Sequence, residues 1–252
     1  GPAGLRLETP CTAIPIATTL AQSWDMDLIH RMGKLVGEEM KQLHVDLWLA
    51  PGMNIHRNPL CGRNFEYYSE DPVLTGLCAA TETKGVQSQK GKGTTIKHFA
   101  GNNQEDNRMF TNAHISERAL REIYLKGFEI AVKTAQPYAI MTSYNLINGV
   151  HSANNYDMLQ NIARDEWGFE GLVMTDWYTS QDTTEMGMVS PSGKYSHSSS
   201  VQCIKAGNDL QMPGCQQNVD DIVEAVNEGK EITKADLQRC AKHILSVALK
   251  TM

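Results

Sequence analysis

The sequence predicts a parallel α/β fold, and more specifically a (β/α) TIM-like barrel. Its 252 residues suit one such barrel, which often runs to about 250 residues. Short apolar runs alternate with amphipathic helical segments along the chain, a pattern typical of βαβ units. The runs are almost continuously apolar, as expected for strands that are buried on both faces of a parallel sheet.

Five apolar runs are the expected strands of this sheet. Their ranges are 45–50, 93–99, 138–144, 171–177 and 209–212. A barrel and a doubly wound sheet both fit this alternation. No G-x-G-x-x-G or P-loop motif follows a strand, however, and this disfavours a nucleotide-binding doubly wound fold.

Amphipathic segments between the strands predict five helices, whose apolar residues recur at intervals of three and four. Asp25 and Ser116 are placed to cap two of them, and Pro72 occupies a first helical position. We expect helices over 26–43, 72–89, 116–135, 155–166 and 233–249. The last is expected to turn inward Leu237, Cys240, Ala241, Ile244, Leu245 and Ala248. Two long polar segments, 52–71 and 178–200, are the expected loops.

The composition excludes several classes of protein. The formal net charge is −6 and the chain has no Lys/Arg run, so neither nucleic acid nor an anionic membrane is an expected partner. No apolar stretch reaches the roughly 18 residues of a membrane-spanning helix. The six cysteines form no CxxC pair and are expected to be mainly reduced thiols, with a Cys203–Cys215 disulfide left open. The histidines lack metal-ligating spacings, so neither a metal nor another cofactor is expected.

Polar residues at the ends of the strands are the candidates for chemistry, because ligands of parallel α/β folds meet the carboxyl ends of the strands. Asp176 is the strongest candidate. It follows an apolar run, where a carboxylate can act as a nucleophile, a general base or a metal ligand. The alternative is a helix N-cap for the segment that follows.

Lys97 and His98 end the second predicted strand, and Arg63 lies in the first polar loop. These donors suit a substrate that is rich in hydroxyl groups, and a guanidinium can also orient a carboxylate. A salt bridge for Lys97 and a core hydrogen bond for His98 are the structural alternatives. For Arg63 the alternative is an ion pair with Glu66 or Glu70.

Two aromatic residues stand at strand ends as well. Trp177 offers an indole face on which a sugar ring can stack, and core packing is the alternative for it. Tyr144 can donate its hydroxyl to a neighbouring carboxylate, or belong to the core.

Long motifs, in their order along the chain, resemble glycoside hydrolase family 3, the family of β-glucosidases and β-xylosidases. The similarity covers nearly the whole chain and is strongest over residues 1–215. The matching segments are 1–6, 50–57, 62–72, 97–105, 118–125, 141–149, 167–177 and 206–213.

The resemblance implies roles for individual residues. Asp176 corresponds to the catalytic nucleophile of a retaining mechanism, and Tyr144 to a residue that donates a hydrogen bond to it. The implied substrate is a terminal β-glucoside or β-xyloside, either an oligosaccharide or an aryl glycoside. The segment at 97–101 lacks the Asp-x-His dyad of the family's N-acetylglucosaminidases. The implied ligands and neighbours of the innermost sugar are Arg63, Lys97, His98, Met141, Tyr144 and Trp177.

The chain departs from the family pattern at its start, where Gly1 stands in a motif that usually begins Asp-Gly-Pro. We therefore expect residues 1–252 to form one barrel domain that lacks its first strand. The α/β sandwich domain, which usually carries the acid/base Glu, is also expected to be absent. Gln211 replaces a common Glu. Three glutamates are expected to be structural partners of arginines instead: Glu66 of Arg63, Glu70 of Arg57 and Glu105 of Arg108.

Two other functions remain open at this stage. One is a sugar-binding barrel without catalysis. The other is a metal-dependent barrel hydrolase that uses His98, His151 and Asp176. The sequence leaves the cellular compartment and the oligomeric state open, a homo-oligomer included.

Overall fold

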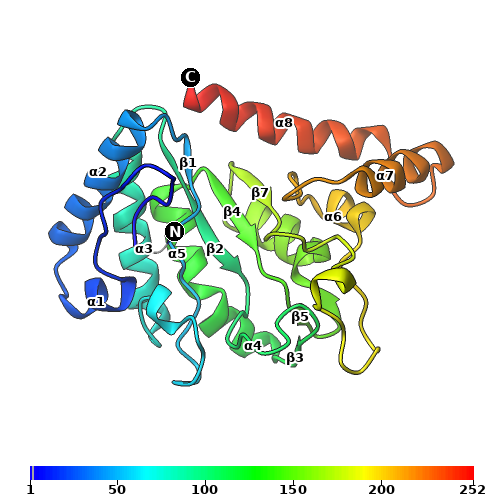
Figure 1. Cartoon of the computed structure of the whole chain (residues 1–252), viewed down its shortest axis with the longest axis horizontal. Coiled ribbons are helices and arrows are strands. Elements are labelled where there is room, and N and C mark those ends of the chain that lie inside the picture. Colours follow the sequence, from blue (N-terminus) through cyan, green and yellow to red (C-terminus); the bar gives the residue numbers. More distant parts are fainter. Residues whose placement is uncertain (2) are drawn as a thin grey trace.

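The computed structural model describes residue 1 and residues 3–252, so Pro2 of the first family-like motif lies outside the described residues. Its centre is a parallel sheet in the order β1-β2-β4-β7 (Figure 1). The α/β class and the parallel sheet are thus confirmed, and every strand except β2 is shorter than the apolar run that predicted it. The strands are β1 (Leu47–Trp48), β2 (Gly93–Phe99), β4 (Ala139–Thr142) and β7 (Leu172–Met174).

The fifth predicted strand, 209–212, is reduced to a single parallel bridge between Leu210 and Met174. The amides of Asp209 and Leu210 both donate to the Val173 carbonyl. Pro213 follows and has no N–H with which to continue a ladder. The segment therefore lies beside β7 without forming a strand.

Helices α2 (Met26–Gln42), α3 (Pro72–Gln87) and α5 (Lys126–Ala135) pack against one another on one side of the sheet (Figure 1). The Asp25 carboxylate caps α2 by accepting from Leu28 N at 2.9 Å. Glycine allows α2 and α3 to approach closely, since a Cβ at Gly33 would lie 2.3 Å from the Glu82 carbonyl oxygen.

Two predicted helices are wound differently from an α-helix. Segment 116–135 divides into α4 (Glu117–Ala119), a π-helical turn over 120–124, and α5. Segment 155–166 forms a π-helix at Asp157–Glu166. Apolar spacing locates a helix but does not separate these windings, because their periods differ by less than one residue per turn.

Several short elements were not predicted, since two to seven residues carry little periodicity. Gln216–Glu228 is the one longer helix that was missed. The short strands form a second, small sheet in the order β3-β5-β6. The additional elements are α1 (Ala17–Gln22), α6 (Ser200–Ala206), α7 (Gln216–Glu228), β3 (Asn112–Ala113), β5 (Leu146–Ile147) and β6 (Val150–His151).

Helix α8 (Lys234–Thr251) begins where it was expected, and a capping box of Thr233 and Asp236 stabilises its first turn. Its predicted inward face is partly wrong. Cys240 is buried, but Leu245 is 62% exposed, and Ala241 and Ala248 are exposed as well. Figure 1 shows α8 lying across one end of the sheet. There Val247, which was not among the residues expected to face inward, is buried in one cluster with Leu172 and Met174 of β7.

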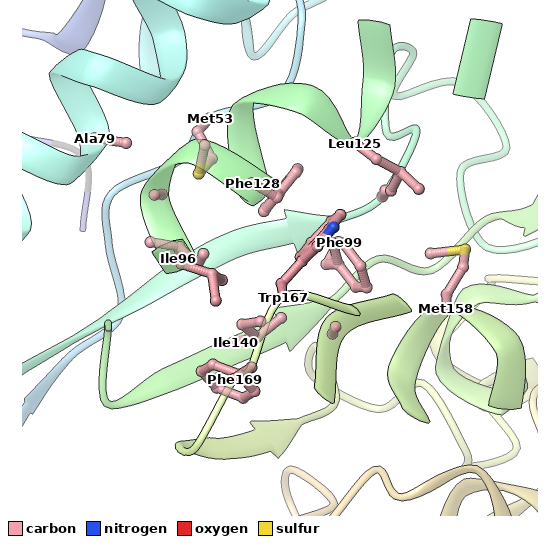
Figure 2. Close-up of a cluster of buried hydrophobic side chains, with 14 of the residues drawn as sticks. Met53, Ala79, Ile96, Phe99, Leu125, Phe128, Ile140, Met158, Trp167 and Phe169 are labelled. Atoms are coloured by element: carbon pink, nitrogen blue, oxygen red, sulfur yellow. The ribbon is translucent and has the colours of Figure 1, made fainter. Parts of the chain in front are cut away.

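The main core lies between the sheet and the helices on one of its faces. Phe99 at the end of β2 packs edge-on against Phe128 and Trp167, with ring centroids 5.1 and 5.9 Å away (Figure 2). Ile96 and Ile140 complete the sheet side of this cluster. The buried aromatic residues fix the end of β2, from which two candidate site residues project.

All six cysteines lie in the described part of the chain and are free thiols, Cys203 and Cys215 among them. Among residues 1 and 3–252, no helix combines the length and the apolar character that crossing a membrane requires.

Candidate active site

A pocket of about 420 Å³ opens beyond the carboxyl ends of β2, β4 and β7. It brings together the residues that the sequence placed at separate strand ends and in the first loop. Leu49, Arg108, Tyr178, Met186 and Met188 complete its lining. The seven predicted residues that line it are Arg63, Lys97, His98, Met141, Tyr144, Asp176 and Trp177.

Asp176 follows β7 by two residues and its side chain is buried. Its Oδ1 accepts from Trp177 N at 2.8 Å, and Oδ2 lies 3.6 Å from His98 Nε2. A backbone turn follows rather than a helix, so the capping alternative does not apply. Burial raises the pKa of Asp176, while the Trp177 amide and the charges of Lys97 and Arg63 oppose the rise.

His98 is a neutral imidazole with a defined tautomer. Burial, and then the charges of Arg63 and Lys97, lower its pKa well below the ordinary value. The Arg63 guanidinium can only donate, so at 3.0 Å it places the accepting lone pair on Nε2. Nδ1 therefore carries the proton and faces the Tyr67 hydroxyl at 3.1 Å. The contact of His98 with Asp176 is consequently not an ion pair.

Lys97 and His98 are adjacent, yet both side chains line the pocket. Strict alternation would send them to opposite faces of the sheet. The register of β2 against β4 shifts between Ile96 and Phe99, and this irregularity interrupts the alternation where the two residues stand.

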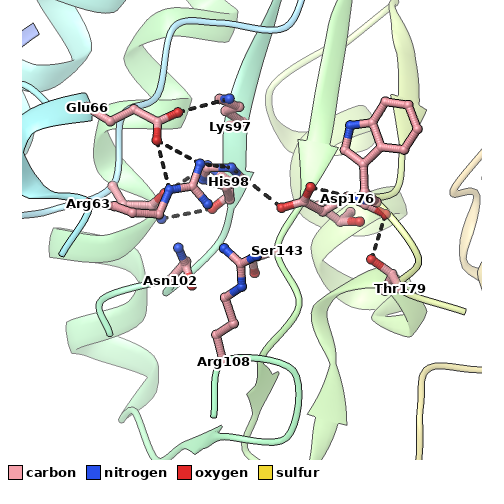
Figure 3. Close-up of polar contacts among 12 residues, drawn as sticks. Arg63, Glu66, Lys97, His98, Asn102, Arg108, Ser143, Asp176 and Thr179 are labelled. Atoms are coloured by element: carbon pink, nitrogen blue, oxygen red, sulfur yellow. Dashed lines mark hydrogen bonds and ion pairs between the residues drawn. The ribbon is translucent and has the colours of Figure 1, made fainter. Parts of the chain in front are cut away.

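Glu66 joins two of the cations that face the pocket (Figure 3). Its Oε1 lies 2.9 Å from Lys97 Nζ, and its Oε2 accepts from Arg63 Nε at 2.8 Å. Burial alone would raise the pKa of Glu66, but the charges of Lys97 and Arg63 outweigh burial and lower it. Both salt-bridge alternatives from the sequence are therefore present, and both cations still reach the pocket.

Arg108 lines the pocket, although the sequence predicted only an ion pair with Glu105 for it. Its guanidinium lies 4.7 Å from the centroid of the Tyr144 ring, and it also pairs with Glu105 at 2.8 Å. Figure 3 shows it entering the pocket from the loop after β2. A cation in the loop that follows a site-bearing strand was the signal that could have found it.

The aromatic residues differ in exposure. Tyr144 is buried, and burial followed by the negative charge of Asp176 raises the pKa of its hydroxyl. Trp177 is 46% exposed at the pocket and is therefore not a core residue. Met141 is buried on β4 and pairs in register with Met174.

Two other ionisable residues named from the sequence, Arg57 and His151, have partners that were not expected. Arg57 donates to the Tyr124 hydroxyl at 3.1 Å instead of pairing with Glu70 within residues 1 and 3–252, so that expected ion pair is wrong. Within the same residues, no three His, Cys, Asp or Glu side chains converge as a metal site would require. Both ring nitrogens of His151 face carbonyl oxygens, those of Tyr144 and Ser196.

Comparison with known proteins gives a family. The model of the glycosyl hydrolase family 3 N terminal domain matches residues 3–247. A β-glucosidase of Ruminococcus albus is 43% identical over 100% of this chain and 26% of that protein. An exo-alpha-(1->6)-L-arabinopyranosidase of Bifidobacterium breve is 48% identical over 96% of this chain and 29% of that protein.

A solved structure is similar as well. The β-glucosidase 3B from Thermotoga neapolitana, in complex with glucose, matches with a TM-score of 0.87 and 46% identity. The match covers 99% of this chain and 35% of that one. The chain thus spans between 26% and 35% of the length of these three relatives.

Proposed function

The chain belongs to glycosyl hydrolase family 3, with the TIM-barrel-like fold of its N-terminal domain, and we propose that it carries the sugar-binding and nucleophilic residues of a retaining β-glycosidase. The observation that carries the proposal is a buried carboxylate, Asp176, in a pocket that is also lined by the donors Arg63, Lys97 and Arg108. A sugar offers hydroxyl oxygens to such donors and an electrophilic carbon to such a carboxylate.

The proposed reaction begins at Asp176 Oδ2, because Oδ1 is engaged by the Trp177 amide. Oδ2 attacks the anomeric carbon and forms a glycosyl ester, while the bond from that carbon to the aglycone oxygen breaks. The electron pair leaves with the aglycone oxygen, which takes a proton from a carboxylic acid. The carboxylate left by that acid then takes a proton from water, whose oxygen attacks the same carbon and releases the Asp176 carboxylate.

The cations have two tasks in this scheme. Lys97, Arg63 and Arg108 favour the ionised form of Asp176, which is the form that attacks. They also present N–H donors toward the bound sugar. Neutral His98 contributes an imidazole whose orientation is fixed by Arg63 and Tyr67.

The acid/base group is proposed to come from a region outside residues 1–252, which form one barrel domain of a larger protein. In the described part of the chain, Asp176 is the sole carboxylate that lines the pocket. Glu66 and Glu105 are held by arginines instead. The share of the relatives' length that this chain spans is consistent with a further domain.

The proposed substrates are terminal β-glucosides or β-xylosides. The relatives named β-glucosidase favour glucose as the glycone, and the relative named arabinopyranosidase keeps a pentopyranose open. A panel of 4-nitrophenyl β-glucoside, β-xyloside and α-L-arabinopyranoside would rank them.

A 2-deoxy-2-fluoro-β-glucoside with a dinitrophenyl leaving group tests the nucleophile directly. This leaving group needs no protonation, so the test does not depend on the acid/base residue. Peptide mass spectrometry should find the sugar on Asp176. Asp176→Asn should remain unlabelled, whereas Asp182→Asn, in the exposed loop nearby, should be labelled as the parent chain is.

A second candidate function is sugar binding without catalysis. It is favoured by the single carboxylate among the described residues of the pocket. It predicts that glucose binds and that no covalent adduct forms under the same conditions. Label on another residue would contradict both functions.

A further inference from the structure

A second cavity, of about 320 Å³, adjoins the proposed sugar pocket. Arg108 and Met188 line both spaces, so the two lie side by side. We call it the Met109 cavity. Its apolar wall consists of Met109, Phe110, Met188, Val189 and Pro191.

The walls of the Met109 cavity are held in place by contacts on both sides. Met109 and Phe110 are buried in one cluster with Tyr144, which belongs to the sugar pocket. Thr183 is fully buried and donates from its hydroxyl to the Met188 carbonyl at 2.9 Å. The Met188 amide donates back to the Thr183 carbonyl at 3.2 Å.

The two charged residues that line this cavity, Arg108 and Glu105, are paired with each other. Arg108 pairs with Glu105 at 2.8 Å, and Asn102 donates to the same carboxylate at 3.0 Å. A second sugar ring would need several free donors and acceptors, because each buried hydroxyl without a partner costs free energy. The cavity offers apolar carbon and sulfur atoms instead.

Its position relative to the sugar pocket indicates which part of a substrate would enter. Gly187, at φ +74°, turns the chain between Met186 and Met188, so this segment forms a wall common to both spaces. A substituent of a sugar in the pocket that extends past this wall would enter the Met109 cavity.

We propose that the Met109 cavity binds the aglycone of the glycoside, and that it takes a flat apolar aglycone such as a phenyl ring rather than a second sugar. This inference rests on the proposed function. The two methionines are unbranched and polarizable, and their sulfur atoms make favourable contacts with aromatic rings. An aryl glycoside is therefore preferred over a disaccharide with the same glycone.

Two-dimensional NMR of the chain with ¹³C-labelled methionine methyl groups tests the inference. The probes are the hydrolysis-resistant methyl, phenyl and glucosyl 1-thio-β-glucosides. The phenyl compound should shift the methyl resonances of Met109 and Met188 through the ring current, whereas the methyl compound should leave Met109 unshifted. Met158, buried in the main core, serves as the reference.

The same ligands give an affinity ratio. The phenyl compound should bind about tenfold more tightly than the methyl compound, as one well-buried apolar group can provide. Val189→Asp places a charge at the half-exposed rim of the cavity and should bring this ratio close to one. Val219→Asp, on α7, should leave the ratio unchanged, and the two valines are 50% and 51% exposed.

The outcomes separate the two proposals. If the methyl compound does not bind, the proposed function fails and this inference fails with it. If the methyl compound binds but the phenyl ring brings no gain, or shifts the Trp177 indole and not Met109, only this inference is overturned. An equal or larger gain from the glucosyl compound, or an unchanged ratio in Val189→Asp, also overturns it.

Discussion

Arg63 donates to His98 through Nη2 at 3.0 Å, and this contact fixes the imidazole as an acceptor at Nε2. The pKa of His98 lies well below its ordinary value because the ring is buried and several cations surround it. The ring is therefore a fixed neutral group in the physiological range rather than a proton donor to Asp176. Asp176 and the surrounding cations therefore determine how the charge of the pocket changes with pH.

Lys97→Met should move the acid limb of the pH profile, in which the rate of covalent labelling falls with falling pH, to higher pH. The charge of Lys97 opposes the burial that raises the pKa of Asp176, so its removal raises that pKa further. Since ionised Asp176 is the attacking form, labelling is lost earlier as the pH falls. The expected shift is roughly one pH unit, measured as the labelling rate by the 2-fluoroglucoside against pH.

Lys92→Met is the matched control for that shift. The side chains of Lys92 and Lys97 are 11% and 10% exposed, and each pairs with a carboxylate, but Lys92 pairs with Asp46 outside the pocket. In Lys92→Met, the acid limb of the labelling rate against pH should stay where it is in the parent chain. An unmoved limb in Lys97→Met would show that Lys97 does not act on Asp176.

Glu66→Gln should weaken both the fold and sugar binding. The change leaves Lys97 and Arg63 without the buried charge that they share. Breaking such a pair costs about 3 kcal/mol of unfolding free energy, and affinity for glucose should fall because both cations lose their positions. Urea unfolding and calorimetry measure the two effects.

Glu129→Gln provides the comparison, since Glu129 likewise pairs with two cations, Lys126 and Lys133. That cluster lies nearer to solvent, and its loss should cost less than about 1 kcal/mol. Equal losses of unfolding free energy in the two variants would contradict the larger contribution predicted for the buried Glu66 cluster.

Glu82→Gln should stabilise the chain above neutral pH. Glu82 is buried in α3 and accepts a hydrogen bond from the Tyr68 hydroxyl. Burial raises the pKa of Glu82 from 4.5 to about 7, so the folded chain holds this proton more tightly than the unfolded chain. Stability then declines as the pH rises from 4.5 through 7, by up to about 3 kcal/mol for that shift.

Glutamine retains the acceptor for Tyr68 and cannot ionise, so the difference between variant and parent should grow across this pH window and vanish below it. Urea midpoints at several pH values give the comparison. Parallel curves for parent and variant would refute the assignment.

Asp209→Asn should destabilise β7, the strand that leads to Asp176. The buried Asp209 carboxylate accepts from Val173 N and Arg164 Nη2, each at 2.8 Å. Its neutralisation leaves the Arg164 charge buried, at a cost of about 3 kcal/mol in unfolding free energy. Asp46→Asn, which breaks the more exposed pair with Lys92, should cost under about 1 kcal/mol.

The sequence predicted much of the fold because strong local patterns coincided with tertiary burial. Runs such as 93–99 became strands, and Asp25 and Ser116 became helix caps. The apolar pattern did not identify the type of helix at Asp157–Glu166, which is a π-helix, because α- and π-helices have similar periods. It also failed where burial depends on a neighbour, as for Leu245 on α8.

The sequence by itself determined the parallel α/β class, the family, and which residues stand at strand ends, because apolar runs and motif order are written along the chain. Only the tertiary structure decided how those residues act on one another. Arg108 enters the pocket from a loop, and Glu66 pairs with both Lys97 and Arg63. The charge of His98 and the pKa of Asp176 depend on burial and on distances to other charges, and these arise only when segments far apart in the sequence come together in the fold.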